Sequence, residues 1–302
     1  MITNVPGIKV GHQQNESAKT GCTVILTEDG ATCGVDVRGS APGTRETDLL
    51  DPINLVDQVH AISLAGGSAY GLDAASGIMQ FLEEREVGLD VGVCKVPIVP
   101  SAILFDLAIG DASVRPDQLM GYRAAQNATE KAVKEGSVGA GCGATVGKIA
   151  GFEAVSDSGI GSASIELENG LIVGAIVAVN AFGDVSDPKT GEIVAGARNL
   201  ETGEFLNSTK MMRKQAEAGG FPGTNTTIGA VAVNAKLTKS EAKKVAQVAQ
   251  NAIGRTISPA HTMYDGDTIF ALATGEERFS VDLIAQLGIE VMEQAILNAV
   301  GK

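Results

Sequence analysis

The alternation of apolar and polar positions along the chain predicts a series of strands and helices. Short β-branched, apolar runs indicate buried strands, and Gly-containing turn signals between them indicate hairpins. The strands expected on this basis are 20–39 (two strands around Glu28-Asp29-Gly30), 152–167 and 170–180 (joined at Glu168-Asn169-Gly170), 226–235 and 268–274.

Apolar residues at helical spacing predict helices between these strands. Helix 68–85 carries Leu72, Ala75, Met79 and Leu82 on one face. A second helix is expected over 116–135, ending at Gly136, and a closing helix over 280–300. Another follows the capping box Thr238-Lys239-Ser240-Glu241 and carries Ala242, Val245, Ala246, Ala249 and Ile253 on one face. Strands outnumber clear parallel crossovers, and no linker or repeat divides the chain. We therefore expect a single α+β layered domain over residues 1–302.

Composition and charge narrow the class of protein. The chain has 302 residues, 44% of them hydrophobic and only 4% aromatic, with 38 Gly and no Trp. Its net charge of −13 argues against attraction to nucleic acid or to an anionic membrane. Its four Cys lack CxxC spacing and its N-terminus does not resemble a signal peptide, so we expect reduced thiols in a cytoplasmic protein. No apolar run is expected to span a membrane.

Several familiar motifs are incomplete. Gly139 to Ala144 fits the loose GxGxxA pattern but follows a predicted helix, and Gly147-Lys148 lacks the Ser or Thr that ends a phosphate loop. Gly66-Gly67-Ser68-Ala69 is followed by Tyr70, so no GxSxG elbow exists. With three His in the chain, a His-rich metal site is excluded, and no elbow supports a Ser-His-Asp triad. A His-independent nucleophile is favoured, with no metal and no cofactor.

Thr226 stands where a predicted loop meets a predicted buried strand. The segment Gly219 to Asn225 is rich in Gly and Pro and predicts a loop, and the strand 226–235 follows directly. Such a hydroxyl suits a nucleophile released by self-cleavage: Thr226 would attack the carbonyl of Asn225, and its new α-amino group would be its base. Taken alone, the segment favours the ordinary alternative, a polar strand start after a surface turn.

Asp265 and Asp267 form a second candidate. On an extended segment, their carboxylates would point to the same face, and their repulsion would raise one pKa. Such a pair can hold an amine and pass a proton. One alternative is a plain Asp-Gly turn. Another is a DxD metal site, which the lack of further acids or His nearby in the sequence disfavours.

Six segments occur in a fixed order: Arg38–Asp48, Gly66–Asp73, Gly143–Lys148, Asn180–Asp184, Asn225–Ile228 and Asp265–Thr268. Together they resemble the self-processing L-aminopeptidase/D-esterase family, which includes β-peptidyl aminopeptidases and nylon-oligomer hydrolases. Each segment is a weak signal alone, but their order is specific and spans nearly the whole chain. The similarity is greatest to the branch with a Thr nucleophile, as in nylon-oligomer hydrolase.

The resemblance implies a fold and a processing event. The fold is a four-layer αββα sandwich of the N-terminal-nucleophile-hydrolase type, shared with ornithine acetyltransferase. The precursor would be cut after Asn225 into residues 1–225 and 226–302, which stay together, usually within a tetramer. Thr226 would be the nucleophile.

The resemblance also implies the residues that assist Thr226. Asn180 would supply an amide to the oxyanion hole, because an amide N–H is a neutral donor suited to developing negative charge. Lys148 would lie near the new amine and lower its pKa, and Asp265 and Asp267 would orient and polarise it. The alternatives are a strand-end turn for Asn180 and a solvated surface charge for Lys148.

Two further segments are assigned to substrate binding. Phe105 is placed where members of the family carry a pocket wall, often with a Tyr, so this chain would lack a hydroxyl there. Gly66, Gly67 and Ser68 would let the backbone approach the active centre closely, or would serve packing at a helix start.

The expected function is release of N-terminal residues from short peptides, amides or ω-amino acid oligomers. An acyltransferase of the ornithine acetyltransferase type, an endo-acting nylon-oligomer hydrolase and an uncut structural homologue are the alternatives. The expected partners are a small peptide or amide substrate and further copies of the chain, with neither nucleic acid nor membrane.

Overall fold

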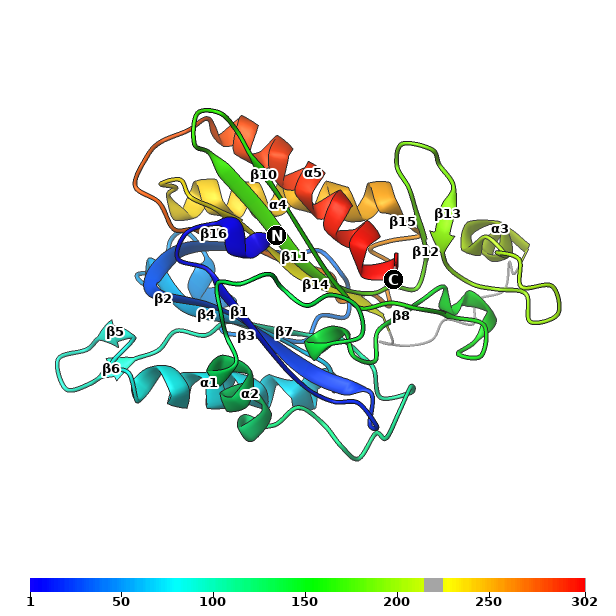
Figure 1. Cartoon of the computed structure of the whole chain (residues 1–302), viewed down its shortest axis with the longest axis horizontal. Helices are drawn as coiled ribbons and strands as arrows, with labels where there is room; N and C mark the ends of the chain where they lie inside the picture. The colour runs from blue at the N-terminus through cyan, green and yellow to red at the C-terminus, as the bar shows by residue number, and fades with distance from the viewer. Residues whose placement is uncertain (215–224, 302) are drawn as a thin grey trace.

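A mixed β-sheet forms the centre of the molecule (Figure 1). The computed structural model describes residues 1–214 and 225–301. Within them, nine strands join in the order β10-β11-β14-β16-β2-β4-β7-β3, with β1 paired to β2. The strands are β1 (Lys9–Asn15), β2 (Thr20–Val37), β3 (Thr44–Arg45), β4 (Gln58–Ala65), β7 (Ser101–Ile103), β10 (Ile160–Glu166), β11 (Ile172–Asn180), β14 (Thr226–Val233) and β16 (Thr268–Ala273). The β14–β16 and β4–β7 pairs are parallel.

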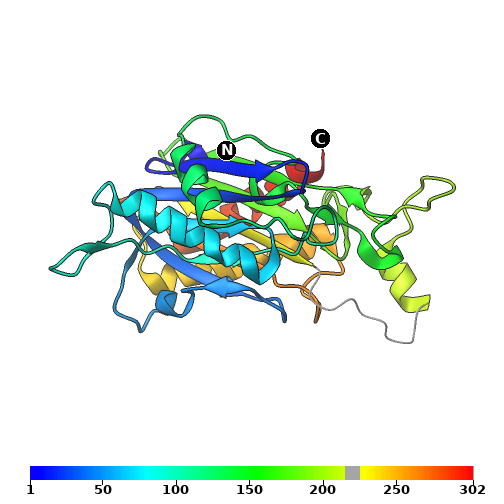
Figure 2. The same cartoon turned by 90° about the horizontal axis from the view of Figure 1, so that it is seen from below.

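Helices cover both sides of this sheet. Figures 1 and 2 show α1 and α2 on one side and α4 and α5 on the other. The helices are α1 (Ala74–Glu83), α2 (Gln118–Gln126), α3 (Ser208–Lys214), α4 (Lys239–Thr256) and α5 (Val281–Val300), with 3-10 turns η1 (Ile2–Asn4), η2 (Asp48–Leu50), η3 (Ser68–Asp73), η4 (Gly139–Gly141) and η5 (Lys148–Ala150). Short strands complete the list: β5 (Leu89–Asp90), β6 (Lys95–Val96), β8 (Thr145–Val146), β9 (Ser156–Asp157), β12 (Asp184–Ser186), β13 (Ile193–Ala195) and β15 (Ile257–Ser258).

Strand β2 carries the sheet from one layer to the next. Its first half pairs with β1 and its second half with β16. Between Leu26 and Ala31 its register against β4 shifts, and Gly30 there has φ of +86°. The hairpin expected at 20–39 is therefore wrong. Left-handed backbone at Gly30 absorbs the extra residues as a bulge, and the strand continues instead of turning back.

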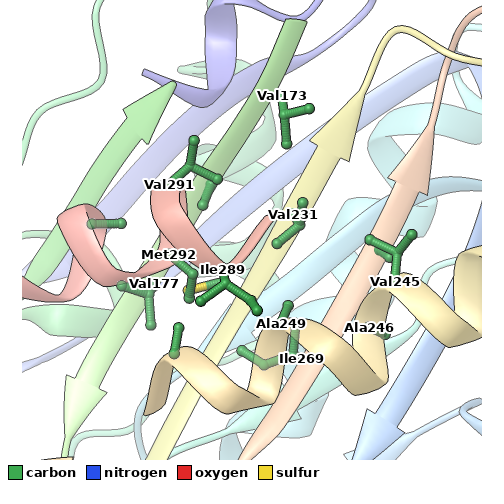
Figure 3. Packing of buried hydrophobic residues seen from close by; sticks show 14 of the residues in the cluster. Val173, Val177, Val231, Val245, Ala246, Ala249, Ile269, Ile289, Val291 and Met292 are labelled. Atoms are coloured by element: carbon green, nitrogen blue, oxygen red, sulfur yellow. The ribbon is translucent and has the colours of Figure 1, made fainter. Parts of the chain in front are cut away.

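Three apolar clusters separate four layers. One lies between α4, α5 and the strands, a second lies between the two layers of strands, and a third lies under α1 and α2. Side chains alternate accordingly: Val231 of β14 packs toward α4 and α5 (Figure 3), whereas Ile228 and Ala230 pack into the inner cluster. This arrangement confirms the expected αββα sandwich.

Most of the predicted elements are present, with three changes of length. The helix expected over 68–85 is the 3-10 turn η3 over Ser68–Asp73 followed by α1 over Ala74–Glu83. Helix α2 ends at Gln126 instead of 135, because Thr129 leaves the helix and pairs with Val10 of β1. Strand β10 begins at Ile160 instead of 152, since the preceding residues form the short strand β9 against β8. The capping box before α4 is confirmed, with Thr238 and Glu241 bonding each other's backbone N–H groups.

By length and composition alone, helix α5 is long and apolar enough to cross a membrane. This finding corrects the expectation that no apolar segment of the chain reaches that length. However, 56% of its apolar window is buried inside the protein. Met292 and Ile296 lie in the cluster shared with α4 and the strands (Figure 3 labels Met292). This burial is typical of a core helix.

Candidate active site

Thr226 lies at the centre of the sheet, at the first position of β14. Strands β11 and β14 run antiparallel, and their register places Asn180 directly opposite Thr226. Thr226 is buried, and its Oγ1 donates a hydrogen bond to the carbonyl oxygen of Asn225. Asn225 itself forms a bridge with Asp265. Of the loop predicted ahead of Thr226, residues 219–224 lie outside the described part of the chain.

The side chain of Asn180 is held in one orientation. Its Oδ1 accepts hydrogen bonds from Lys148 Nζ at 2.9 Å and from the backbone N–H of Thr145 at 3.1 Å. Its Nδ2 donates to the carbonyl of Phe105 at 2.8 Å. An amide nitrogen carries two hydrogens. One of them is bonded to Phe105, and no hydrogen bond within the described part of the chain involves the second.

Lys148 is buried next to Asn180, with 3% of its surface exposed. Its Nζ donates to the carbonyl oxygens of Thr145, Asn180 and Ala181 as well as to Asn180 Oδ1. Burial lowers the pKa of Lys148 to about 7, and the charges of Asp265 and Asp267 oppose that shift. The alternative of a solvated surface charge is therefore wrong. The ring of carbonyl acceptors stabilises an ammonium group at this position.

The two acids lie against the same strand start. Asp267 Oδ1 accepts the backbone N–H of Thr227 at 2.7 Å, and Asp265 Oδ2 accepts that of Thr262 at 2.6 Å. Burial and, to a smaller extent, the nearby charge of Asp267 raise the pKa of Asp265 to about 6. The segment from Asp265 to Asp267 has features of both the expected acid pair and the expected Asp-Gly turn. Asp265 closes a turn on Thr262, and β16 begins only at Thr268, yet both carboxyl groups are buried at the candidate site.

Two neighbours of this pair were not singled out by the sequence. A Cβ at Gly266 would lie 2.8 Å from Thr226 Oγ1, so only glycine gives the nucleophile room there. His261 Nδ1 lies 2.8 Å from Asp267 Oδ2. The sequence places both residues beside the acids but carries no signal that the chain folds back onto them.

Of the residues assigned to substrate binding, Phe105 is linked to the site through Asn180, whereas Gly66, Gly67 and Ser68 contact residues 104 and 106. Phe105 is half-buried, and its carbonyl anchors Asn180. Gly67 N–H donates to Asp106 Oδ1 at 2.7 Å, and a Cβ at Gly66 would lie 1.9 Å from Asp106 Oδ2. Ser68 N–H donates to the carbonyl of Leu104. The close backbone approach that the structure shows is therefore to Asp106, beside Phe105.

The site thus brings together a hydroxyl, an oriented amide, a buried cation and a pair of acids. Among residues 1–214 and 225–301, no group of three or more His, Cys, Asp or Glu side chains is placed to hold a metal ion. Cavities lie in other parts of the molecule. One of about 820 Å³ lies between residues 13–17 and 114–123, one of about 520 Å³ lies between β1 and residues 127–138, and another of about 520 Å³ lies between β10 and α5.

Comparison with known proteins identifies the family. The model of peptidase family S58 matches residues 1–302. This chain belongs to peptidase family S58. The family named from the six ordered segments is confirmed, and S58 membership makes the chain a hydrolase of peptide or amide bonds.

Relatives of this S58 chain fall into two groups. An uncharacterized aminopeptidase of Mycobacterium leprae is 45% identical over 295 residues, covering 91% of this chain and 78% of that protein. A 6-aminohexanoate-oligomer endohydrolase of a Kocuria species is 33% identical over 311 residues, covering 97% of this chain and 84% of the relative.

Solved structures share the fold. The L-aminopeptidase D-Ala-esterase/amidase of Ochrobactrum anthropi, described as a variant of the Ntn hydrolase fold, matches with a TM-score of 0.73 at 19% identity. A Burkholderia β-aminopeptidase matches with a TM-score of 0.70 at 21% identity. Each covers 99% of this chain and 85% of its own. The N-terminal-nucleophile-hydrolase type of sandwich is thereby confirmed.

Proposed function

We propose that this S58 hydrolase processes itself at Asn225–Thr226 and then releases N-terminal residues from short peptides or amides through an acyl-enzyme on Thr226. One observation carries the proposal. The hydroxyl of Thr226 is hydrogen-bonded to the carbonyl of the residue before it, opposite the oriented amide of Asn180. This contact supports Thr226 Oγ1 as the nucleophile and the Asn225 carbonyl as its target, and the register supports the Asn180 amide as the oxyanion donor.

The cleavage step is an N-to-O acyl shift. Thr226 Oγ1 attacks the carbonyl carbon of Asn225 and gives up its proton. The C–N bond then breaks, the nitrogen takes up a proton, and an ester links Asn225 to Thr226 Oγ1. Water hydrolyses that ester. The products are a carboxylate on Asn225 and a free α-amino group and hydroxyl on Thr226.

Turnover repeats this chemistry on a substrate. The neutral α-amine of Thr226 accepts the hydroxyl proton while Oγ1 attacks the substrate carbonyl. The free hydrogen of the Asn180 amide then donates to the oxyanion. The leaving amine takes the proton, and water releases the acyl group. Burial of Thr226 in the continuous chain supports a need for cleavage before substrate can enter.

The charged side chains around Thr226 suit this cycle. Lys148 holds Asn180 through Oδ1 and disfavours a second positive charge on the amine. Asp267 holds the start of β14 through Thr227 N–H, and Asp265 has a raised pKa that suits proton exchange near neutrality.

The substrate class follows the relatives. Those at 44–45% identity are named aminopeptidases, and those at 32–33% are named hydrolases of 6-aminohexanoate oligomers or their analogue. Amide-linked amino acids are common to the substrates of both names, and only the aminopeptidase name implies a free amino end. We propose exo-cleavage as the main activity, with endo-cleavage of nylon oligomers as the alternative.

We also propose that the two cut chains stay together as a cytoplasmic homo-oligomer, a tetramer in the simplest case. Strand β14 lies between β11 and β16 in the middle of the sheet, so its separation would expose the core. Ile53, Leu55 and Val93 are each more than 90% exposed, and we propose these positions for contact with further copies. The four Cys are unpaired, which supports a reducing compartment.

Two measurements test the proposal. Intact mass and light scattering of the purified protein should give two chains, 1–225 and 226–302, within one particle. A panel of L-, D- and β-aminoacyl p-nitroanilides and nylon oligomers, with and without an acceptor amine, should give hydrolysis in both conditions. A single uncut chain without amidase activity would contradict the proposal. Product formation only in the presence of the acceptor amine would identify the chain as an acyltransferase.

A further inference from the structure

His261 is bonded to one of the two buried acids and not to the other. Its ring Nδ1 lies 2.8 Å from Asp267 Oδ2, and its backbone N–H donates to the same oxygen at 3.3 Å. The other oxygen of Asp267 accepts Thr227 N–H. Both oxygens of Asp267 accept backbone N–H groups, which favours an ionised carboxylate, and on that ground we assign the hydrogen of this contact to Nδ1. Asp267 therefore has three N–H donors.

Asp265 has a weaker set of partners. Its partners both belong to Thr262, whose backbone N–H donates to Oδ2 and whose side chain also hydrogen-bonds to the carboxyl group, and burial raises its pKa to about 6. Because two adjacent buried carboxylates repel each other, the pair holds a proton more readily than a single exposed acid would. The acid with more donors keeps the negative charge, and the other takes the proton.

The remaining charged groups do not remove this asymmetry. Lys148 acts on both acids from η5. The backbone N–H of Arg38 donates to the carbonyl of Asp267, but its guanidinium is directed to Asp36 and to the carbonyl of Gln247. His261 thus supplies two of the three N–H donors to Asp267 and none to Asp265. It is also the more accessible group, with 21% of its side chain exposed against 3% for Asp267.

We propose that His261 is a positioning residue that keeps Asp267 ionised through its Nδ1–H, so that the exchangeable proton of the pair resides on Asp265. Ionised Asp267 then holds Thr227 N–H, and with it the start of β14 next to Thr226. The catalytic consequence rests on the proposed function. Which of the two acids carries the proton does not depend on that function, and it can be measured in a chain that is never cut.

The backbone at His261 allows a matched pair of variants. Its φ of +54° lies in the left-handed region, which Asn and Gly adopt readily. His261→Asn keeps an N–H donor near the position of Nδ1 but has no ionisable ring. His261→Gly removes the donor. Both variants retain the local backbone, so melting curves should confirm that both fold.

The direct test uses the uncut Thr226→Val chain and follows the aspartate carboxyl carbons by ¹³C NMR as pH falls. With His261 present, Asp265 should take up the first proton. In His261→Gly the first proton should move to Asp267, and the midpoint of Asp265 should fall by about one pH unit, a tenfold change in its ionisation constant. His261→Asn should keep most of the parent order. Unchanged protonation order in His261→Gly overturns the proposal, and an Asn variant that matches Gly overturns its assignment to the hydrogen bond.

Activity gives a second readout in the processed enzyme. His261→Gly should lower kcat with little change in KM and move the acidic limb of the pH profile, and His261→Asn should restore both. A parent enzyme without amidase activity would overturn the proposed function while leaving the NMR result on the acid pair intact. An unchanged profile in His261→Gly, with the parent active, would instead overturn the role of His261.

Discussion

Asn180 and Thr226 face each other as the last residue of β11 and the first residue of β14. Their proximity is set by a backbone ladder in the middle of the sheet and not by a loop. A backbone ladder holds the amide in a fixed position, which suits the oxyanion role proposed for Asn180. Lys148 and Phe105 then set the rotation of the amide about the strand end.

Replacement of the Thr226 hydroxyl should abolish cleavage. Thr226→Val keeps the volume and branching of the side chain but removes its oxygen, so the purified protein should remain one chain without amidase activity. Thr226→Ser keeps the hydroxyl and should still be cut, though more slowly, because its side chain is less constrained. Intact mass spectrometry of both variants measures the fraction of each that is cut. A Val variant cut after Asn225 would show that another group is the nucleophile.

Loss of the Asn180 amide should act on kcat. Asn180→Asp keeps the shape of the side chain and its acceptors for Lys148 and Thr145, but it removes the N–H donor. We expect a fall in kcat of about 10²–10³-fold with little change in KM, as for loss of one oxyanion donor. Steady-state kinetics on a p-nitroanilide, corrected for the processed fraction, measures this. A variant that loses affinity and keeps kcat would assign Asn180 to binding.

The candidate site was largely predictable because its residues stand in short ordered segments. Thr226 opens an apolar run, and Asn180 closes one, so their chemistry and their strand ends are visible in the sequence. Their mutual distance is not, since it depends on β11 and β14 being neighbours. The contacts of His261 and Gly266 depend on how the chain folds back before β16, and local patterns carry no information about that path.

The fold was predictable where periodicity was long and failed where local turn signals were overridden. The apolar face of α4 and its capping box act locally, and both are present. Gly30 carries a hairpin signal, but pairing with β4 on both sides of the bulge favours a continued strand. Helix α2 stops early because Thr129 finds a partner in β1, a contact far away in sequence.

A side chain at position 266 should block the nucleophile. In Gly266→Ala, the new Cβ would lie 2.8 Å from both Thr226 Oγ1 and the Ala41 carbonyl, so the local backbone must move. We expect slower cleavage and a loss of roughly 1–3 kcal/mol in the free energy of unfolding. Gly254→Ala is the matched control, because that exposed position in α4 has no atom within 4 Å of a new Cβ. Its stability should stay equal or rise by about 0.5–1 kcal/mol. Denaturant unfolding of both variants and cleavage rates in cell-free synthesis compare them, and normal cleavage in Gly266→Ala would contradict the close contact.

Neutralising Asp265 should remove one part of the pH dependence. The pKa of Asp265 is raised to about 6 by burial and by Asp267, so the acid gains its charge as pH rises through that value. If the ionised form supports catalysis, its fraction, and with it the rate, rises about tenfold between pH 5 and 7. Asp265→Asn keeps the neutral form at every pH. It should be slower by about 10²-fold or more near neutrality and should lack this rise. Near-normal turnover in a folded variant would reduce Asp265 to a turn residue.

The charge of Lys148 should set the pH at which the α-amine of Thr226 becomes active as a base. The α-amine of Thr226 has an ordinary pKa of about 7.7–8.0 and must be neutral to accept a proton. A neighbouring ammonium disfavours the protonated amine and lowers its pKa, whereas Asp265 and Asp267 favour the protonated form. Lys148→Met removes the positive charge, so the rising limb should move to higher pH. Burial lowers the pKa of Lys148 to about 7, which is close to the pKa expected for the amine. The rising limb of the unmodified enzyme therefore reports the coupled ionisation of Lys148, the amine and the two acids, and not that of one group. The variant also loses a donor to Asn180, so kcat should fall at every pH. Profiles measured on fully processed enzyme separate the two effects. A lower kcat with an unshifted limb would leave Lys148 the role of holding Asn180 alone.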